Sequence, residues 1–175
     1  HRIVDLACNG ELVDASGTLL PAAAGGAVFS RDTDRQYLEL KSSDEISFGK
    51  PEKLKFGSSS DFSVSFLVKM GATTGSFGTM VGNRAIEGGQ TRGWAIGTTR
   101  DGVLRWELAD SRAGVQIQAP APILSDGRWH HVAVTHDRDG EAIVYLEGVE
   151  IKREVISGIG NVDTSSDFRI GGRFF

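Results

Sequence analysis

The segment from Asp126 to Gly140 (DGRWHHVAVTHDRDG) concentrates residues that could bind a metal ion or transfer protons. It holds three of the four histidines of the chain and three aspartates. Its alternating apolar residues predict a strand, in which His130 and His136 share a face but lie roughly 20 Å apart at ~3.3 Å per residue. His130 and His131 would point to opposite faces. This segment alone is therefore not expected to hold a zinc ion.

The DRDG sequence from Asp137 to Gly140 resembles the start of a calcium-binding loop. Such a loop needs glycine at its sixth position and a bidentate glutamate at its twelfth, where this chain has Ala142 and Gly148. We therefore predict a hairpin turn instead, with aspartate side chains bonding nearby backbone amides and Gly140 supplying a positive φ.

Catalytic motifs are not found in the sequence. It contains no G-x-S-x-G, no H-E-x-x-H and no phosphate-binding glycine loop followed by Lys-Ser or Lys-Thr. A β-sandwich glycosidase needs two carboxylates on one strand face. Because Glu107 stands on the same strand face as Arg105, a surface charge pattern explains it more simply than an acid and a nucleophile. No catalytic residue is predicted, although these carboxylates are the candidates for a glycosidase or lyase: Glu39, Glu107 with Asp110, and Glu147 with Glu150.

The composition indicates one ordinary globular domain, which we place over residues 1–175. The mean hydropathy is -0.16, and no apolar run approaches the ~20 residues of a membrane span. A net charge of -4 gives no basic surface for nucleic acid. Cys8 is the only cysteine, which excludes an internal disulfide. Because the chain starts at His1 without a signal peptide, we expect an excised domain or a processed N-terminus.

Period-two alternation of apolar and polar residues predicts an all-β protein. In FSVSFLVK, residues 62, 64, 66 and 68 share one face, and in VLRWELA residues 104, 106 and 108 do so. About a dozen such segments recur every ~8 to 12 residues, separated by glycine-rich turns such as Asp101-Gly102 and Glu147-Gly148. The segment 42–60 is expected to be a long loop with one helical turn. The predicted fold is an antiparallel β-sandwich, or jelly roll.

Four segments between Ser60 and Gly172 resemble the laminin G-like, concanavalin A-like lectin superfamily in its bacterial, pentraxin-related branch. They are SDFSVSFLVK, GWAIGTTRDGVLRWELAD, SDGRWHHVAVTHDRDGEAIVYLEGVEI and NVDTSSDFRIGG. Nearer the N-terminus, CNGELVDASG and QYLELKSSDEISF are similar to the family's first strands. The resemblance implies a concanavalin A-like jelly roll within a secreted, multidomain protein, located outside the cell or in the periplasm. It also implies that Trp129 and His130 belong to a central structural strand, as core residues with buried hydrogen bonds.

The resemblance implies a non-catalytic binding module for carbohydrate or another extracellular ligand, such as a glycan or a protein. Sugar binding uses an exposed aromatic ring with planar polar groups beside it. The segment NRAIEGGQTRGW supplies such a set, and the predicted ligand-binding residues are Asn83, Arg84, Arg92 and Trp94. Alternatively, Trp94 packs inside with Ile96. A second reading is an interdomain packing module attached to a hydrolase, phosphoesterase or sulfatase, and a third is a glycosidase or lyase.

Family members often bind one structural calcium ion near the first strand. Here the resemblance places it at Asn9 and Asp14, with carbonyl groups around Gly10 and Gly17. The alternative is a turn capped by an aspartate, with no metal.

The family normally adds a closing strand after the segment that resembles FRIGG. Because this sequence stops at Phe175, we expect a fragment of a longer protein. The closing strand of the family lies beside the first strand, so its place here is an unpaired edge, is filled by a rearranged N-terminal segment, or is supplied by another chain. We expect the vacant edge to pair with the remaining parts of its own polypeptide or with another chain.

Overall fold

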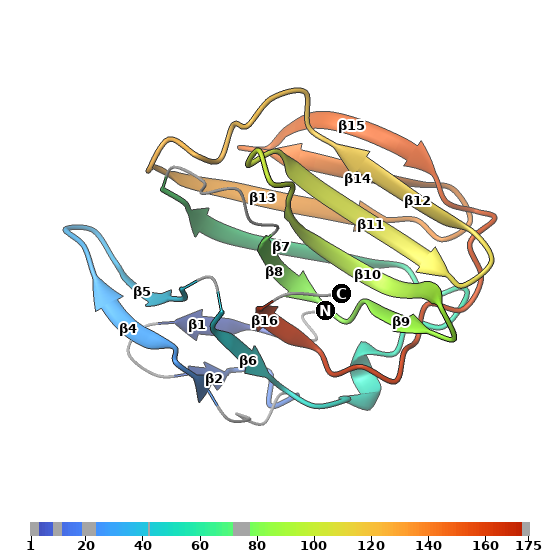
Figure 1. The fold of residues 1–175 in the computed structure, drawn as a ribbon, viewed down its shortest axis with the longest axis horizontal. Coiled ribbons are helices and arrows are strands. Elements are labelled where there is room, and N and C mark those ends of the chain that lie inside the picture. Colours follow the sequence, from blue (N-terminus) through green and yellow to red (C-terminus); the bar gives the residue numbers. More distant parts are fainter. Residues whose placement is uncertain (1–3, 9–11, 19–23, 42, 72–77, 173–175) are drawn as a thin grey trace.

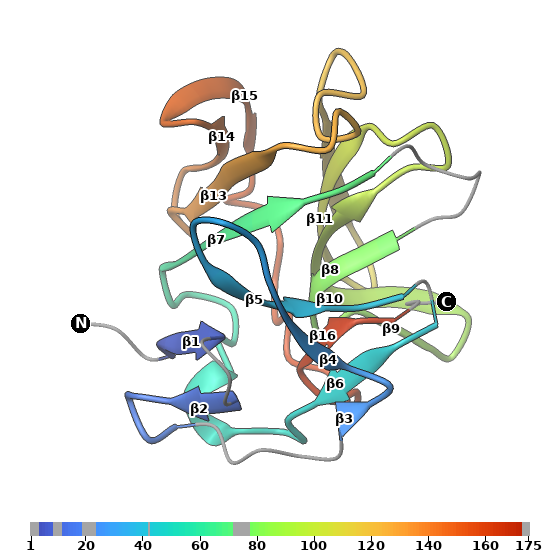
Figure 2. The ribbon, with the colours of Figure 1, turned by 90° about the vertical axis from the view of Figure 1, so that its left-hand side faces the viewer.

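The computed structural model describes residues 4–8, 12–18, 24–41, 43–71 and 78–172. Two antiparallel sheets pack face to face, which confirms the predicted β-sandwich (Figures 1 and 2). The smaller sheet has the strand order β15-β14-β13-β7. Its strands are β7 (Phe62–Lys69), β13 (Trp129–His136), β14 (Glu141–Leu146) and β15 (Val149–Val155).

The larger sheet has the order β12-β11-β10-β8-β16-β6-β3, and β9 pairs with β10 off this path. This sheet contains strands from both the N-terminal and the C-terminal parts of the described chain. Its last strand in sequence, β16, pairs with β8 on one side and with β6 on the other. Its strands are β3 (Ala24–Gly25), β6 (Glu45–Ser47), β8 (Gly78–Gly82), β9 (Ala85–Glu87), β10 (Gln90–Thr98), β11 (Leu104–Asp110), β12 (Gly114–Gln118) and β16 (Arg169–Gly171).

Two hairpins and one helical turn complete the described chain. The hairpins are β1 (Leu6–Cys8) with β2 (Leu12–Asp14), and β4 (Val28–Arg31) with β5 (Gln36–Glu39). The 3-10 helix η1 (Glu52–Leu54) is the helical turn expected in the segment 42–60. That segment also holds β6, which the sequence analysis missed and which buries Ile46 fully. Within the described residues, no helix is long and apolar enough to cross a membrane.

The core lies between the two sheets, where the alternating faces predicted from the sequence meet. Trp106 and Leu108 of β11 are fully buried, as are Val132 and Val134 of β13. Burying each such side chain contributes roughly 1.5–3 kcal/mol relative to leaving it in water. The period-two pattern therefore fixes which face of each strand enters the core.

The buried histidine of β13 is His136, and not His130, for which a core role was predicted. The indole Nε1–H of Trp106 donates to His136 Nε2 at 2.9 Å, and His136 Nδ1 lies 3.1 Å from the carbonyl oxygen of Phe62. His130 instead lies near the surface, with its ring nitrogens 2.9 Å from Asp126 Oδ1 and 3.2 Å from Glu147 Oε1. The histidine-rich segment is thus a structural strand.

The turn predicted from Asp137 to Gly140 is present between β13 and β14. The amide of Gly140 donates to the carbonyl of Asp137 at 3.0 Å, and Asp137 Oδ1 accepts from Asp139 N at 3.2 Å. The predicted positive φ of Gly140 is wrong. A Cβ at Gly140 would lie 2.7 Å from the Asp137 carboxylate, which a larger residue would displace.

The two edges of the smaller sheet differ in their protection. Four of the seven residues of β15 are charged, namely Glu150, Lys152, Arg153 and Glu154, and such charges discourage pairing with another strand. At the other edge, β7 pairs with β13 alone among the described strands. Its single charge is its last residue, and its Leu67 side chain is 51 % exposed. The strand β7 is therefore the edge available for pairing.

We expect the free edge of β7 to pair with neighbouring polypeptide. The isolated chain should then self-associate, and Leu67→Lys should shift it toward the monomer because an edge lysine opposes strand addition. Size-exclusion chromatography with multi-angle light scattering across a concentration series measures this. A parent chain that stays monomeric at every concentration, with slow amide exchange along β7, would contradict the prediction.

Candidate functional site

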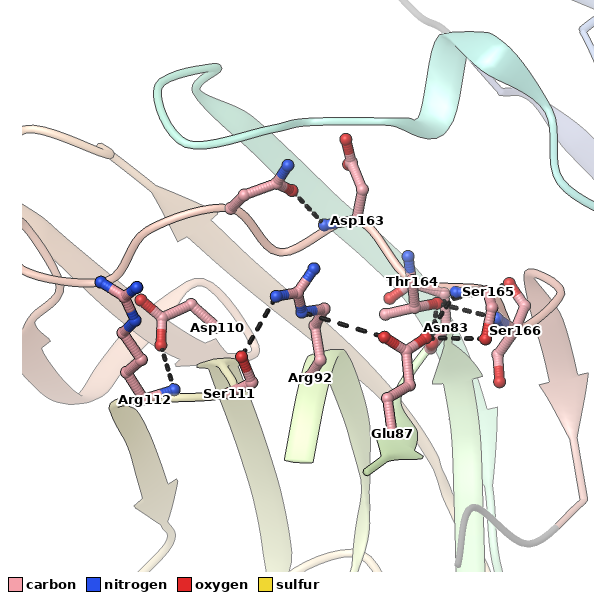
Figure 3. Close-up of polar contacts among 11 residues, drawn as sticks. Asn83, Glu87, Arg92, Asp110, Ser111, Arg112, Asp163, Thr164, Ser165 and Ser166 are labelled. Carbon is pink, nitrogen blue, oxygen red and sulfur yellow. Dashed lines mark hydrogen bonds and ion pairs between the residues drawn. The ribbon is translucent and has the colours of Figure 1, made fainter. Parts of the chain in front are cut away.

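The four predicted ligand-binding residues lie on or beside β8, β9 and β10, but their side chains enter three different environments. One is the core, one is the outer face of the larger sheet, and one is a polar surface at the end of the sandwich (Figure 3).

Trp94 is in the core, as the alternative interpretation held. Its side chain is 2 % exposed and packs against Phe62 and Phe168, with ring centroids 5.6 and 6.1 Å away. It shares this face of β10 with Ile96, because residues two apart in a strand point the same way. Trp94 therefore has no free ring face for stacking on a sugar, and that part of the binding hypothesis is corrected.

Arg84 lies over the outer face of the larger sheet. Its Nε is 2.7 Å from Glu107 Oε2, and Arg105 pairs with the other oxygen of the same carboxylate. The surface pattern predicted for Arg105 and Glu107 is present, with Arg84 as a third member. Asp110 follows Glu107 by three residues and so faces the opposite side of β11. These two carboxylates cannot act as an acid and a nucleophile on one sugar.

Arg92 reaches the polar surface at the end of the sandwich. Its Nη2 donates to Ser111 Oγ at 3.1 Å, and its Nε lies 3.9 Å from Glu87 Oε2 (Figure 3). The side chain is 32 % exposed. It points to the same side of the sheet as Asp110, its cross-strand partner. Ser111 has a φ of 79°, a backbone conformation that is uncommon for a residue with a side chain and that often accompanies function.

Asn83 fixes the loop above this surface. Its Oδ1 accepts from Trp94 N at 3.1 Å, and its carbonyl accepts from Thr164 Oγ1 at 2.8 Å. Gly93 has a φ of 95°, and a Cβ there would lie 2.7 Å from Thr164 Cγ2 and 2.8 Å from Asn83 Oδ1. The glycine lets the loop approach the sheet. Asn83 thus positions the surface through its backbone and side chain.

The loop 159–166 is held at several points by hydrogen bonds from other elements. Gly160 N donates to Asp110 Oδ2 at 2.7 Å, and Ser165 donates to Glu87 Oε1 through its amide at 2.6 Å and its hydroxyl at 2.7 Å. These bonds from Ser165 lower the pKa of Glu87. At the other face of the loop, Gly57 N donates to Asp163 Oδ1 at 3.0 Å. Hydrogen bonds therefore fix the loop to β9, to β11 and to the segment before β7.

We define the polar rim as residues 87–92, 110–113 and 160–166. Only its first segment was predicted from the sequence, because the other two segments join it only in the folded chain. No aromatic residue occurs in these three segments. The rim can recognise a ligand by hydrogen bonds and charge, and it cannot stack on one.

Comparison with known proteins identifies the family. A family model described as the concanavalin A-like lectin/glucanases superfamily matches residues 32–175. The chain belongs to this superfamily. Its strands, its sandwich and its jelly-roll relatives agree with the resemblance seen in the sequence.

This superfamily member is similar to parts of larger bacterial toxins. It is 29 % identical over 167 residues to botulinum neurotoxin type X of Clostridium botulinum, covering 93 % of this chain and 13 % of that protein. The binding domain of Paraclostridial Mosquitocidal Protein 1 superposes with a TM-score of 0.78 at 20 % identity, over 92 % of this chain and 41 % of that one. The botulinum neurotoxin serotype D ligand binding domain in complex with N-Acetylneuraminic acid gives a TM-score of 0.73 at 22 % identity, over 98 % and 42 %. This chain therefore spans less than half of each solved binding domain.

The calcium site expected from the superfamily involves Asn9, which lies outside the described residues, and Asp14. The Asp14 carboxylate accepts hydrogen bonds from Asp5 N at 2.7 Å, Ser16 N at 3.0 Å and Thr18 N at 2.8 Å. This is the capped turn of the alternative interpretation. In the part of the chain that the structure describes, no three His, Cys, Asp or Glu side chains are grouped to hold a metal ion.

A calcium ion at Asn9 and Asp14 stays a prediction. If it binds the native state alone, calcium at 100 times its Kd would stabilise the domain by about 2.7 kcal/mol. Differential scanning calorimetry with calcium and with a chelator measures the difference. An unchanged Tm would leave Asp14 as a turn cap only.

Proposed function

We propose that this domain is a non-catalytic module that binds an extracellular glycan at the polar rim. The observation that carries the proposal is the loop 159–166, which four separate parts of the chain hold in one conformation while its outer side faces solvent. Binding to a rigid loop avoids the entropy cost of ordering it. The polar rim is therefore suited to binding a glycan.

The comparisons support this class of function. The solved relatives are named as binding domains, and one of them is a complex with N-Acetylneuraminic acid, a sugar. Since this chain matches less than half of that domain, the support concerns the class of module and not the position of the sugar. By the same reasoning, we place the domain in a secreted, multidomain protein, outside the cell or in the periplasm.

Catalysis is a weaker explanation of the same residues. Glu107 forms ion pairs with two arginines on one face of β11. Asp110 accepts hydrogen bonds from Gly160 N through Oδ2 and from the amides of Arg112 and Ala113 through Oδ1. Neither carboxylate is placed as an acid or a nucleophile beside the other. We therefore infer that the domain itself is not an enzyme.

A glycan array followed by titration calorimetry tests the proposal. We expect retention on at least one glycan class and a loss of affinity of about 10-fold or more for Arg92→Gln, because a hydrogen bond to a charged group contributes about 1.5–3 kcal/mol. Arg128→Gln is the matched control, because Arg128 is exposed and pairs only with Asp126 among the described residues. It should bind as the parent does. No retention on any glycan would refute the proposal.

An interdomain packing module is the second candidate. It is favoured by exposed apolar side chains at two places, Val149 and Val155 on β15 and Val28 and Phe29 on β4, and by the free edge of β7. Exposed apolar surface of this kind marks contacts with another domain. Under this candidate function, the partners are the remaining parts of its own polypeptide. Substitutions in the polar rim should then leave the contact with the neighbouring domain unchanged.

A further inference from the structure

The charges of the polar rim indicate the class of glycan that it would bind, and this inference rests on the proposed function. Three carboxylates and two guanidinium groups occur in the rim, so its composition alone favours neither anions nor cations. The hydrogen bonds of these groups distinguish the carboxylates from the guanidinium groups. A group that already bonds to other parts of the protein has less capacity to bind a ligand.

The carboxylates are used to hold the backbone. Glu87 accepts both bonds from Ser165, and Asp110 accepts from the amides of Gly160, Arg112 and Ala113. Asp163 accepts from the amide of Gly57. A carboxylate that already accepts from backbone N–H groups has less capacity to accept from a sugar hydroxyl.

The guanidinium groups remain available. Arg92 bonds Ser111 through Nη2, and its Nε lies 3.9 Å from Glu87 Oε2, while no described residue bonds its Nη1. The Arg112 side chain is exposed and makes no hydrogen bond or ion pair with any described residue. The two arginines stand on either side of Ser111 (Figure 3). The Ser165 hydroxyl donates to Glu87 Oε1 at 2.7 Å, and Ser166 lies beside it on the same surface (Figure 3).

We propose that the polar rim binds an acidic glycan, one that carries a carboxylate or a sulfate group, and that Arg92 is the residue that pairs with this group. A planar guanidinium binds such oxyanions with two parallel hydrogen bonds, which a neutral sugar cannot match. Arg112 adds positive charge, and the Ser166 hydroxyl bonds the sugar ring. The rigid loop keeps these donors in place.

Matched glycans on an array test this inference: neutral chains, the same chains ending in a carboxylate sugar, and the same chains bearing sulfate. We expect at least 10-fold tighter binding to one acidic series, weaker binding at higher salt, and loss of that preference in Arg92→Gln. Arg92→Lys should recover only part of the preference for acidic glycans, because lysine keeps the positive charge but lacks the planar pair of N–H donors. Arg128→Gln should keep the preference, and thermal melts should show that every variant is folded.

The outcomes separate the two proposals. Equal affinity for neutral and acidic chains, or a preference unchanged in Arg92→Gln, would overturn the acidic-glycan inference and leave glycan binding intact. No binding to any series would overturn the proposed function itself. A carboxylate preference and a sulfate preference both support the inference and identify the group that is bound.

Discussion

The domain is expected to lose stability as the pH falls from 7 to 4.5, and His136 is the cause. Burial lowers the pKa of this histidine from its ordinary 6.5 to about 3, and the nearby positive charge of Arg138 adds to the effect. The unfolded chain binds a proton below pH 6.5, whereas the folded chain does so only near pH 3. The stabilisation is therefore complete above pH 6.5 and falls by about 1.4 kcal/mol per pH unit below it.

Urea unfolding at pH 7, 6, 5 and 4.5 measures this loss, which should reach about 2.5 kcal/mol over the range. Most of this window lies above the range in which the carboxylates contribute. The pKa values of Glu87 and Glu150 are lowered by hydrogen bonds from Ser165 and Arg153, so their stabilisation starts to be lost only near the ordinary value of 4.5, at the lower end of the window. The pKa of Asp32 is lowered to about 2, chiefly by the Trp129 hydrogen bond, so its own contribution is lost only below its ordinary value of 3.8.

Two variants isolate the histidine. His136→Gln should be less stable at pH 7 by about 2 kcal/mol, because the Trp106 N–H loses a well-placed acceptor, and its stability should hardly change down to pH 4.5. His131→Gln, from the same strand, should keep the slope of the parent protein. A parent protein whose stability stays constant from pH 7 to 4.5 would show that His136 is not held neutral by the fold.

Local alternation was enough to predict the sandwich and most of its strands. In β11, Trp106 and Leu108 alternate with Arg105 and Glu107, and this pattern gives both the strand and its buried face. The same signal applied to Trp94, whose face is shared with Ile96. The prediction that Trp94 binds a ligand relied on the polar residues that flank it. The structure shows that the alternation of apolar and polar residues predicted its burial correctly.

The site could be predicted only in part, because its contacts join distant segments. Arg92 was found from its sequence neighbours, whereas Ser165 meets Glu87 across 78 residues and Asp163 meets Gly57 across 106. No local pattern encodes such pairs. The polar rim follows from the fold, which brings the loop after β15 over the ends of β10 and β11.

Arg138 shows the same limit, and it leads to the second large prediction. It lies in the DRDG turn, where a charged residue is expected in water, yet it is 1 % exposed. Its Nη2 donates to the carbonyls of Ile159 at 2.8 Å, Gly160 at 2.6 Å and Ser58 at 3.3 Å. One guanidinium group therefore ties the loop before β7 to the loop 159–166.

Arg138→Met is expected to destabilise the domain by about 3 kcal/mol or more, because three carbonyls lose their donor and each unsatisfied buried group costs about 1–3 kcal/mol. Arg153→Met is the matched control, since Arg153 makes ion pairs with Glu141 and Glu150 at the surface. Exposed pairs of this kind contribute only about 0–1 kcal/mol. Urea unfolding at pH 7 compares the two.

Hydrogen exchange extends the Arg138 prediction to the site. In Arg138→Met, under conditions where it stays folded, the amides of Gly160 and Ser165 should exchange faster than in the parent, because the loop loses one of its anchors. The affinity for glycan should fall with it, since the loop must then be ordered on binding. If unfolding showed equal losses for Arg138→Met and Arg153→Met, or if exchange in the loop stayed unchanged, the buried arginine would not be the anchor of the polar rim.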